Sequence, residues 1–208
     1  MTTAPHWQRR MASLVLLGVG IAAPLGASRW LTAFTTDTAR ALSVAASPPV
    51  VPNVALLDAD SVSQPLTGDG RALIVDFIAT RCHTLCATQN GIYQQLQRDI
   101  RARGLASRVR LVTISFDPAW DTPRVLRYFA LAQHTDRSVW TVLTPRDSTA
   151  LMPLLQTFGI RVIRDGTEFV HNTALHIVAP TGRLVGIVPI TDVEDALSLA
   201  AAQTGRTP

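Results

Sequence analysis

Cysteine is nearly absent from this sequence, whose 208 residues contain only Cys82 and Cys86. A disulfide stabilises a protein mainly by closing a long loop, so a bridge between residues this close would add little stability. The scarcity therefore excludes a fold held together by disulfides. It leaves one close pair, which is typical of redox and metal sites. Two inert core cysteines are the alternative, which a position at a strand-to-helix turn disfavours.

Charged residues are also few, at 16% of the chain, whereas hydrophobic residues make up 47%. This balance excludes a disordered chain and supports one domain with appendages. The formal net charge is +4, but the arginines are scattered and form no basic cluster with interleaved aromatic residues. We therefore expect a solvated basic surface and no nucleic-acid partner. Internal repeats are absent as well.

The N-terminus has the pattern of a targeting segment. Arg9 and Arg10 precede an apolar run over residues 11–27, which predicts either a cleaved signal peptide or a slightly short signal anchor. Both alternatives send the rest of the chain across a membrane, because positive charge holds the N-terminus inside. We expect an inner-membrane anchor with a periplasmic domain, or a soluble periplasmic protein after cleavage. Residues 28–53, rich in Ala, Ser and Thr and ending in prolines, are predicted to be a flexible tether.

The apolar pattern from residue 54 onward predicts an α/β fold. Continuous apolar runs indicate buried strands, and apolar residues at helical spacing indicate helices. A last helix is predicted to begin at Thr191, whose hydroxyl would pair with Glu194 in a capping box. Predicted strands are residues 72–78, 109–116 and 140–143, predicted helices include 92–100, 123–132 and 151–158, and predicted hairpins are 160–170 and 174–188.

The two cysteines lie where the first buried strand leads into a helix. Cys82 falls in the connecting loop and Cys86 near the first helical turn. The free N–H groups and dipole of a helix N-terminus lower the pKa of a thiol, and the thiolate is both the nucleophile and the metal ligand. A spacing of four places both sulfurs on one side of a helical turn. The pair could therefore chelate an ion or close a disulfide.

Three segments in order resemble the Sco/SenC family, the thioredoxin-fold copper proteins involved in cytochrome c oxidase assembly. The likeness runs from about residue 54 to 202 and implies a thioredoxin-like domain over residues 54–208. That fold is a central mixed sheet flanked by helices, here with an extra hairpin. The segments are FIATRCHTLC at residues 77–86, ISFDPAWDTP at 114–123 and VHNTALHIVAPTG at 170–182.

The resemblance implies a copper site formed by Cys82, Cys86 and His171. Two thiolates suit Cu(I), and an added imidazole also accommodates Cu(II). The implied function is a copper-binding assembly factor that delivers copper to a cytochrome oxidase copper-site subunit or another copper protein. Neighbouring histidines are interpreted differently: His176 is expected to be a packing or surface residue, and His83 to point to solvent.

The sequence departs from the family around these ligands. Family members usually place a proline after each cysteine, where this chain has His83 and Ala87. Asn172 stands where a serine is common, and Ala179 where an aspartate is common. The ligand set is intact while its surroundings differ, which bears on metal affinity, redox potential and partner.

Asp76 supports an alternative function, a thiol–disulfide oxidoreductase that keeps copper-ligand cysteines reduced or acts in redox signalling. It precedes Cys82 by six residues, as the buried aspartate of thioredoxins precedes their reactive cysteine. A carboxyl in apolar surroundings has a raised pKa and can shuttle a proton to and from a thiol. Equally, Asp76 could face a polar gap. A peroxidase using Arg81 beside the thiolate ranks lower, because His171 would then have no role.

Asp117 and Asp121 belong to the second segment of the resemblance. Both are expected to be structural at the loop and helix start. Asp117 follows a strand at its C-terminal end, where the sites of α/β folds gather. A supporting or docking role is therefore the alternative for Asp117.

Overall fold

The computed structural model describes residues 36–82, 85–165 and 168–205. The chain divides into two units, Met1–Ala46 and Ser47–Pro208. Helix α2 (Thr36–Ala46) is the described part of the first unit. The predicted targeting segment, residues 1–27, lies outside the described residues. Within the described ranges, no helix combines the length and apolar character needed to cross a bilayer.

The region predicted to be a tether, residues 28–53, includes regular secondary structure. Its central part forms α2, whose alanines favour a helix. Its end joins the second unit, because Leu184 donates its backbone N–H to Pro49 (3.0 Å) and Val51 donates to Gly182 (2.9 Å). The ordered backbone of the second unit therefore begins before residue 54.

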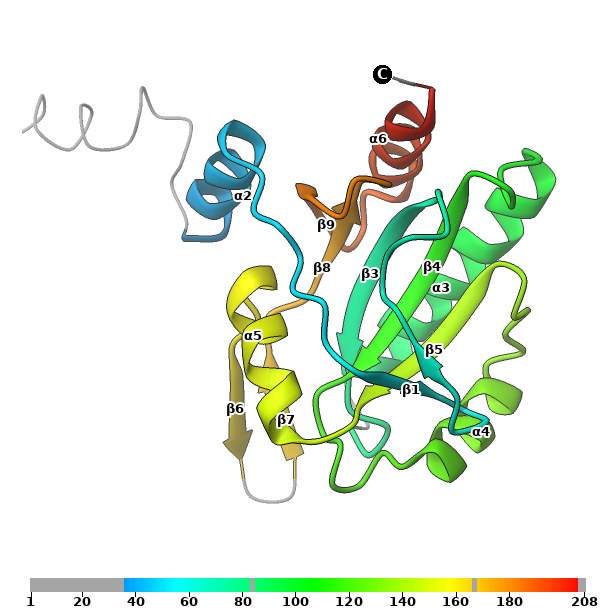
Figure 1. The fold of residues 1–208 in the computed structure, drawn as a ribbon, viewed down its shortest axis with the longest axis vertical. Coiled ribbons are helices and arrows are strands. Elements are labelled where there is room, and N and C mark those ends of the chain that lie inside the picture. The colour runs from blue at the N-terminus through cyan, green and yellow to red at the C-terminus, as the bar shows by residue number, and fades with distance from the viewer. Residues whose placement is uncertain (1–35, 83–84, 166–167, 206–208) are drawn as a thin grey trace, which may run out of the picture. The chain divides into compact units, whose positions relative to one another are not determined.

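A seven-stranded mixed sheet forms the centre of the second unit (Figure 1), in the order β2-β1-β5-β4-β3-β8-β9. The central strands β3, β4 and β5 are parallel, while β1, β8 and β9 pair antiparallel with their neighbours. This confirms the predicted mixed sheet. The strands are β1 (Leu56–Asp58), β2 (Ser63–Gln64), β3 (Ala72–Ile78), β4 (Val109–Ser115), β5 (Trp140–Pro145), β8 (Ala174–Val178) and β9 (Leu184–Pro189).

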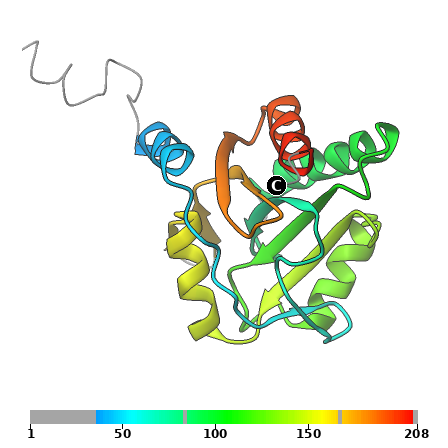
Figure 2. The same ribbon diagram turned by 45° about the horizontal axis from the view of Figure 1, so that its top comes forward.

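Helices cover both faces of this sheet. On one face α3 and α6 pack on the strands around Tyr93, Trp140 and Leu197, which are all fully or almost fully buried. On the other face Phe158 of α5 packs on Phe77 of β3, with ring centroids 5.1 Å apart. Figure 2 shows α5 on the side of the sheet away from α3 and α6. The helices are α3 (Leu85–Ala102), α4 (Pro123–Ala132), α5 (Ser148–Phe158) and α6 (Val193–Thr204).

The extra hairpin is present and forms a sheet of its own. Strands β6 (Val162–Asp165) and β7 (Glu168–His171) pair antiparallel, with Val162 opposite His171. Among the described strands, neither shares a ladder with the main sheet. Figure 1 shows this hairpin beside that sheet. Asn172 and Thr173 join His171 directly to β8, so the hairpin is attached to the main sheet at its base, and side-chain contacts hold the rest of it.

The predicted capping box at the last helix is wrong. Helix α6 begins at Val193, and its N-cap residue is Asp192. The Thr191 hydroxyl donates to Asp192 Oδ1 (2.9 Å), and Glu194 instead forms an ion pair with Arg103 (2.6 Å). The helix thus starts one residue later than the capping box requires, and Arg103, the residue after α3, holds the Glu194 carboxylate. The predicted start of α4 at Pro123 is confirmed.

Candidate functional site

Cys82 lies in the loop that joins β3 to α3, at the carboxyl end of the parallel strands. Its backbone N–H donates to the carbonyl of Ala79 (3.0 Å), and its side chain is only 5% exposed. The thiol faces the carbonyl oxygen of Phe169, with Sγ 3.9 Å away. Cys86 falls in the first turn of α3, as predicted. Its side chain, like all of His83, lies outside what the structure describes.

His171 ends β7 and presents a buried nitrogen. Nδ1 lies 3.1 Å from the carbonyl oxygen of Asn172, which can only accept, so Nδ1 carries the proton and Nε2 the lone pair. Nε2 is buried and has no hydrogen-bond partner among the described residues. Burial lowers the pKa of His171, which favours the neutral imidazole. A neutral ring, oriented through Nδ1 with a free Nε2 lone pair, fits a metal ligand.

Aromatic contacts bring the strand of His171 to the Cys82 loop. Phe116, just after β4, packs on both His171 and Phe169, with ring centroids 4.9 and 5.4 Å away. Phe169 is also the residue whose carbonyl faces Cys82 Sγ. Phe169 therefore links two of the three predicted ligands, because its carbonyl faces Cys82 and it lies on the same strand as His171. Among the described side chains, which exclude Cys86, no three metal-ligating residues cluster.

Asp121 ties the Cys82 loop to the end of β4. It is fully buried and accepts hydrogen bonds from the Thr80 N–H (3.0 Å), the Thr80 hydroxyl and the Ser115 hydroxyl (2.5 Å). Burial raises the pKa of Asp121, and these hydrogen bonds oppose the rise. These contacts agree with the structural role expected for Asp121. Thr80, which makes two of them, lies two residues before Cys82. Its connection to the cysteine segment was not foreseen.

Asp76 is buried on the α3 face of the sheet. Gln89 of α3 donates from Nε2 to Asp76 Oδ2 (2.9 Å). Asp76 Oδ1 and Gln89 Oε1 are both buried acceptors with no hydrogen-bond partner in the described part of the chain. Burial raises the pKa of Asp76 to about 7. A carboxyl with this pKa is largely protonated below neutral pH. Sequence reasoning did not single out Gln89.

His176 is a packing residue, one of the two alternatives expected for it. It is 2% exposed, and its Nδ1 lies 3.2 Å from the carbonyl oxygen of Val75. Its ring meets those of Phe158 and Phe77 edge-on, at 5.4 and 6.1 Å. It therefore belongs to the core on the α5 face.

Asn172 supports the hairpin that carries His171. Its Oδ1 accepts the Arg161 N–H (2.7 Å), and its Nδ2 donates to the Gly159 carbonyl (3.1 Å). The side chain of Asn172 is longer than that of the serine common at this position, and it can therefore connect the two ends of the hairpin. The sequence showed this departure without showing its consequence.

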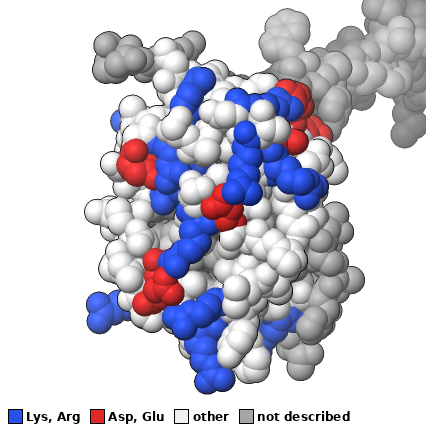
Figure 3. All heavy atoms as spheres, turned by 90° about the vertical axis from the view of Figure 1, so that its right-hand side faces the viewer, with Lys and Arg blue, Asp and Glu red and all other residues white. Residues whose placement is uncertain are grey.

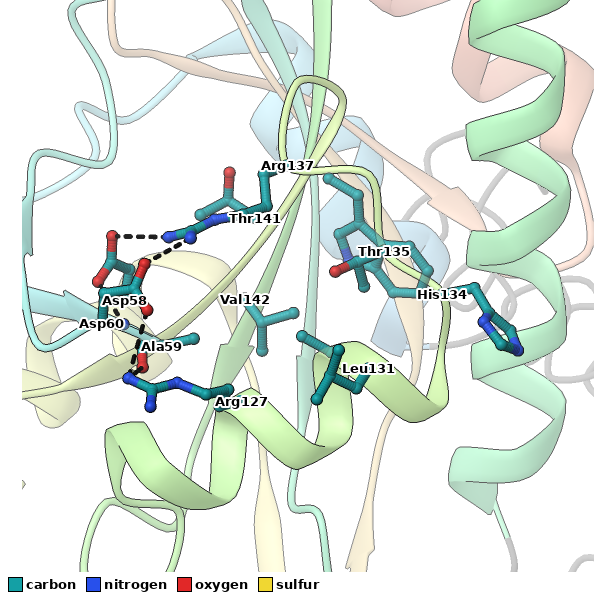
Figure 4. Close-up of a pocket in the computed structure, with 12 residues that line it drawn as sticks. Asp58, Ala59, Asp60, Arg127, Leu131, His134, Thr135, Arg137, Thr141 and Val142 are labelled. Carbon is teal, nitrogen blue, oxygen red and sulfur yellow. Dashed lines mark hydrogen bonds and ion pairs between the residues drawn. The ribbon is translucent and has the colours of Figure 1, made fainter.

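A pocket of about 360 Å³ lies elsewhere, between β1, α4 and β5. Figure 4 shows Arg127 and Arg137 directed at the carboxylates on its rim. Arg127 pairs with Asp60, and Arg137 pairs with both Asp60 and Asp58. Neither Cys82 nor His171 lines this pocket.

Arginines are spread over the surface rather than gathered. Figure 3 shows one face on which basic and acidic side chains are interspersed. Several of the arginines are paired across elements, as Arg101 is with Asp136 and Arg103 with Glu194. Exposed charges of this kind are consistent with the solvated basic surface expected from the composition.

The comparison with protein families matches most of the second unit. The SCO1/SenC family matches residues 57–204, which includes both cysteines and His171. The SCO1 protein homolog of Bacillus subtilis (strain 168) is 27% identical over 119 residues, which cover 56% of this chain and 61% of the relative. This chain thus spans less than two thirds of the length of that curated relative.

Solved structures show the same fold. BsSco, described as a Sco-family cytochrome c oxidase assembly protein with a disulfide switch, superposes with a TM-score of 0.69 at 21% identity, covering 77% of this chain and 96% of BsSco. ScoI of Bradyrhizobium japonicum, solved with copper bound, gives 0.59 at 20% identity, covering 76% and 99%. The predicted thioredoxin-like fold is confirmed. With most of its length matched by the family, this chain belongs to the SCO1/SenC family.

Proposed function

We propose that this protein is a copper-binding assembly factor whose site consists of Cys82, Cys86 and His171. The observation that carries the proposal is the buried Nε2 of His171, which has no partner among the described residues and lies on the strand that Cys82 faces. A buried polar atom without a partner costs free energy, so its retention favours a bound group. Copper-bound ScoI of the same fold supports copper as that group.

Each residue has a definite part in holding the cargo. The thiolates of Cys82 and Cys86 are soft ligands that suit Cu(I), and the neutral imidazole of His171 extends the set to Cu(II). The carbonyl of Asn172 fixes the ring through Nδ1. A largely buried Cys82 limits access of water and oxidants to the thiol. We further propose that the N-terminal segment sends this domain to the periplasm, where an oxidase copper-site subunit or another copper protein receives the copper.

Copper titration of the protein with His171 replaced by alanine tests the site. We expect Cu(II) affinity to fall by at least about tenfold, because the nitrogen ligand is lost. Cu(I) affinity should fall less, since both thiolates remain. The control is His134→Asn, because His134 is exposed and has φ 52°, which asparagine tolerates. Wild-type affinity of His171→Ala for both ions would contradict the site.

A second candidate function is thiol–disulfide exchange, favoured by the buried Asp76. Its carboxyl, with a pKa raised to about 7, could take up or release the proton of a thiol near neutral pH. In such a reaction one thiolate attacks a client disulfide, and the other then resolves the mixed disulfide, so two electrons pass to the client. The disulfide switch described for BsSco is consistent with this chemistry.

Single cysteine variants separate attack from resolution. If Cys82 attacks, Cys86→Ser should accumulate a mixed disulfide with a model disulfide peptide, whereas Cys82→Ser should form none. Mass spectrometry after acid quenching measures both adducts. If both variants gave the same yield of adduct, or if neither gave an adduct, ordered exchange by this pair would be ruled out.

A further inference from the structure

The hairpin that carries His171 has no strand ladder to the main sheet among the described strands. The side chain of Asn172 braces its base, but both of its bonds return to the segment that enters the hairpin. Neither bond reaches the loop of Cys82. Only two residues separate His171 from β8, which pairs with β3 and brings the base of the hairpin near the Cys82 loop. Contacts between the hairpin and that loop then refine the separation between the thiol and the imidazole.

Arg81, immediately before Cys82, makes contacts of this kind. Its Nε donates to Asp117 Oδ2 (2.7 Å), at the end of β4, and Asp117 is buried. Its guanidinium carbon lies 5.3 Å from the ring centroid of Trp120 and 5.1 Å from that of Phe169. One side chain thus joins the cysteine loop, the loop before α4 and the strand of His171.

We propose that Arg81 is a positioning residue that fastens the Cys82 loop to the strand of His171 and so sets the thiol-to-imidazole geometry before copper binds. The inference rests on the proposed copper site for its purpose, but not for its contacts. It also gives Arg81 a task other than activating a peroxidatic thiolate, since its described partners are Asp117, Trp120 and Phe169.

The planar guanidinium matters here more than its charge. Arginine can donate to a carboxylate in the plane of the group while its faces stack on aromatic rings, which a lysine ammonium cannot do. Arg81→Lys therefore keeps the positive charge beside Asp117 and removes the stacking. Arg164 offers a matched control, because its guanidinium carbon also lies 5.1 Å from the Phe169 centroid. Arg164 belongs to the hairpin itself and cannot tether it to the cysteine loop.

Alkylation of Cys82 tests the fastening without copper. In a Cys86→Ser background Cys82 is the remaining thiol of the chain, and the probe is iodoacetamide at fixed pH. Cys82 is only 5% exposed. We expect Arg81→Lys to raise the alkylation rate several-fold, because loss of the Arg81 contacts with Asp117, Trp120 and Phe169 would loosen the Cys82 loop. Trp120→Leu should raise it less, and since Trp120 is 54% exposed this variant leaves the core intact. Arg164→Lys should leave the rate unchanged.

Copper binding with both cysteines present gives the second measurement. We expect Arg81→Lys to weaken Cu(II) binding about tenfold, as is typical when a group that holds a ligand in place is lost. In a His171→Ala background the same change should have no further effect, because its action passes through His171. If Arg81→Lys alters neither alkylation nor Cu(II) affinity, or acts no differently from Arg164→Lys, the proposal is overturned. A wild-type protein that binds no copper would overturn the proposed function, while the alkylation rates would still decide the role of Arg81.

Discussion

Replacing Asp76 with asparagine is expected to stabilise the protein above neutral pH. The folded-state pKa of about 7 exceeds the ordinary aspartate value of 3.8, so the unfolded chain releases this proton first as pH rises. The stability associated with the proton is complete below the unfolded pKa and is lost as pH rises through the folded pKa. Asparagine has no such loss, and its amide oxygen can still accept the hydrogen bond from Gln89 Nε2.

The size of this effect follows from the difference in pKa. At pH 8 the gain is at most about 4 kcal/mol, and at pH 5 it should be less than half of that. Urea unfolding of the reduced, metal-free protein at both pH values measures it. Asp136→Asn is an opposite control, because hydrogen bonds from Ser138 lower the pKa of Asp136. Relative to wild type, that variant should be less stable at neutral pH, and the difference should shrink in acid, where Asp136 of the wild type is protonated. An Asp76→Asn gain that is equal at pH 5 and pH 8 would refute the assignment.

Replacing Asp121 with alanine is expected to be strongly destabilising and to weaken copper binding as well. The change leaves the part-buried Thr80 N–H and the buried Ser115 hydroxyl without their acceptor. Buried donors that lose their partner typically cost about 3 kcal/mol in total. Because Thr80 is two residues from Cys82, the loss also frees the start of the cysteine loop. Urea unfolding at neutral pH and Cu(II) titration measure the two effects.

Two further variants make the Asp121 result specific. Asp121→Asn keeps one acceptor oxygen and should lie between wild type and alanine. Asp60→Ala removes a carboxylate that is paired with Arg127 and Arg137 at the surface, and should cost no more than about 1 kcal/mol. Equal losses from Asp121→Ala and Asp60→Ala would show that the buried cluster does not hold the loop.

Secondary structure followed from the sequence wherever the signal was local. The apolar run of β3 and the Pro123 start of α4 are properties of consecutive residues, and both were predicted correctly. The capping box at Thr191 failed although its motif is also local. The helix begins one residue later than the motif requires, and Glu194 pairs with Arg103, which lies 91 positions earlier in the chain. A motif of a few residues cannot reveal an ion-pair partner that the fold brings from a distant part of the chain.

The cysteine pair, its place at a strand-to-helix turn and the likeness to the SCO1/SenC family were determined by the sequence alone. They depend on residue types and spacings that need no knowledge of distant contacts. Only the tertiary structure decided how His171 approaches Cys82, that its Nε2 is buried without a partner among the described residues, and that Arg81 stacks on Trp120 and Phe169. The physical reason is that His171 lies on a hairpin outside the main sheet. Its position follows from the pairing of β8 with β3 and from side-chain packing between segments far apart in the chain, which no local pattern records.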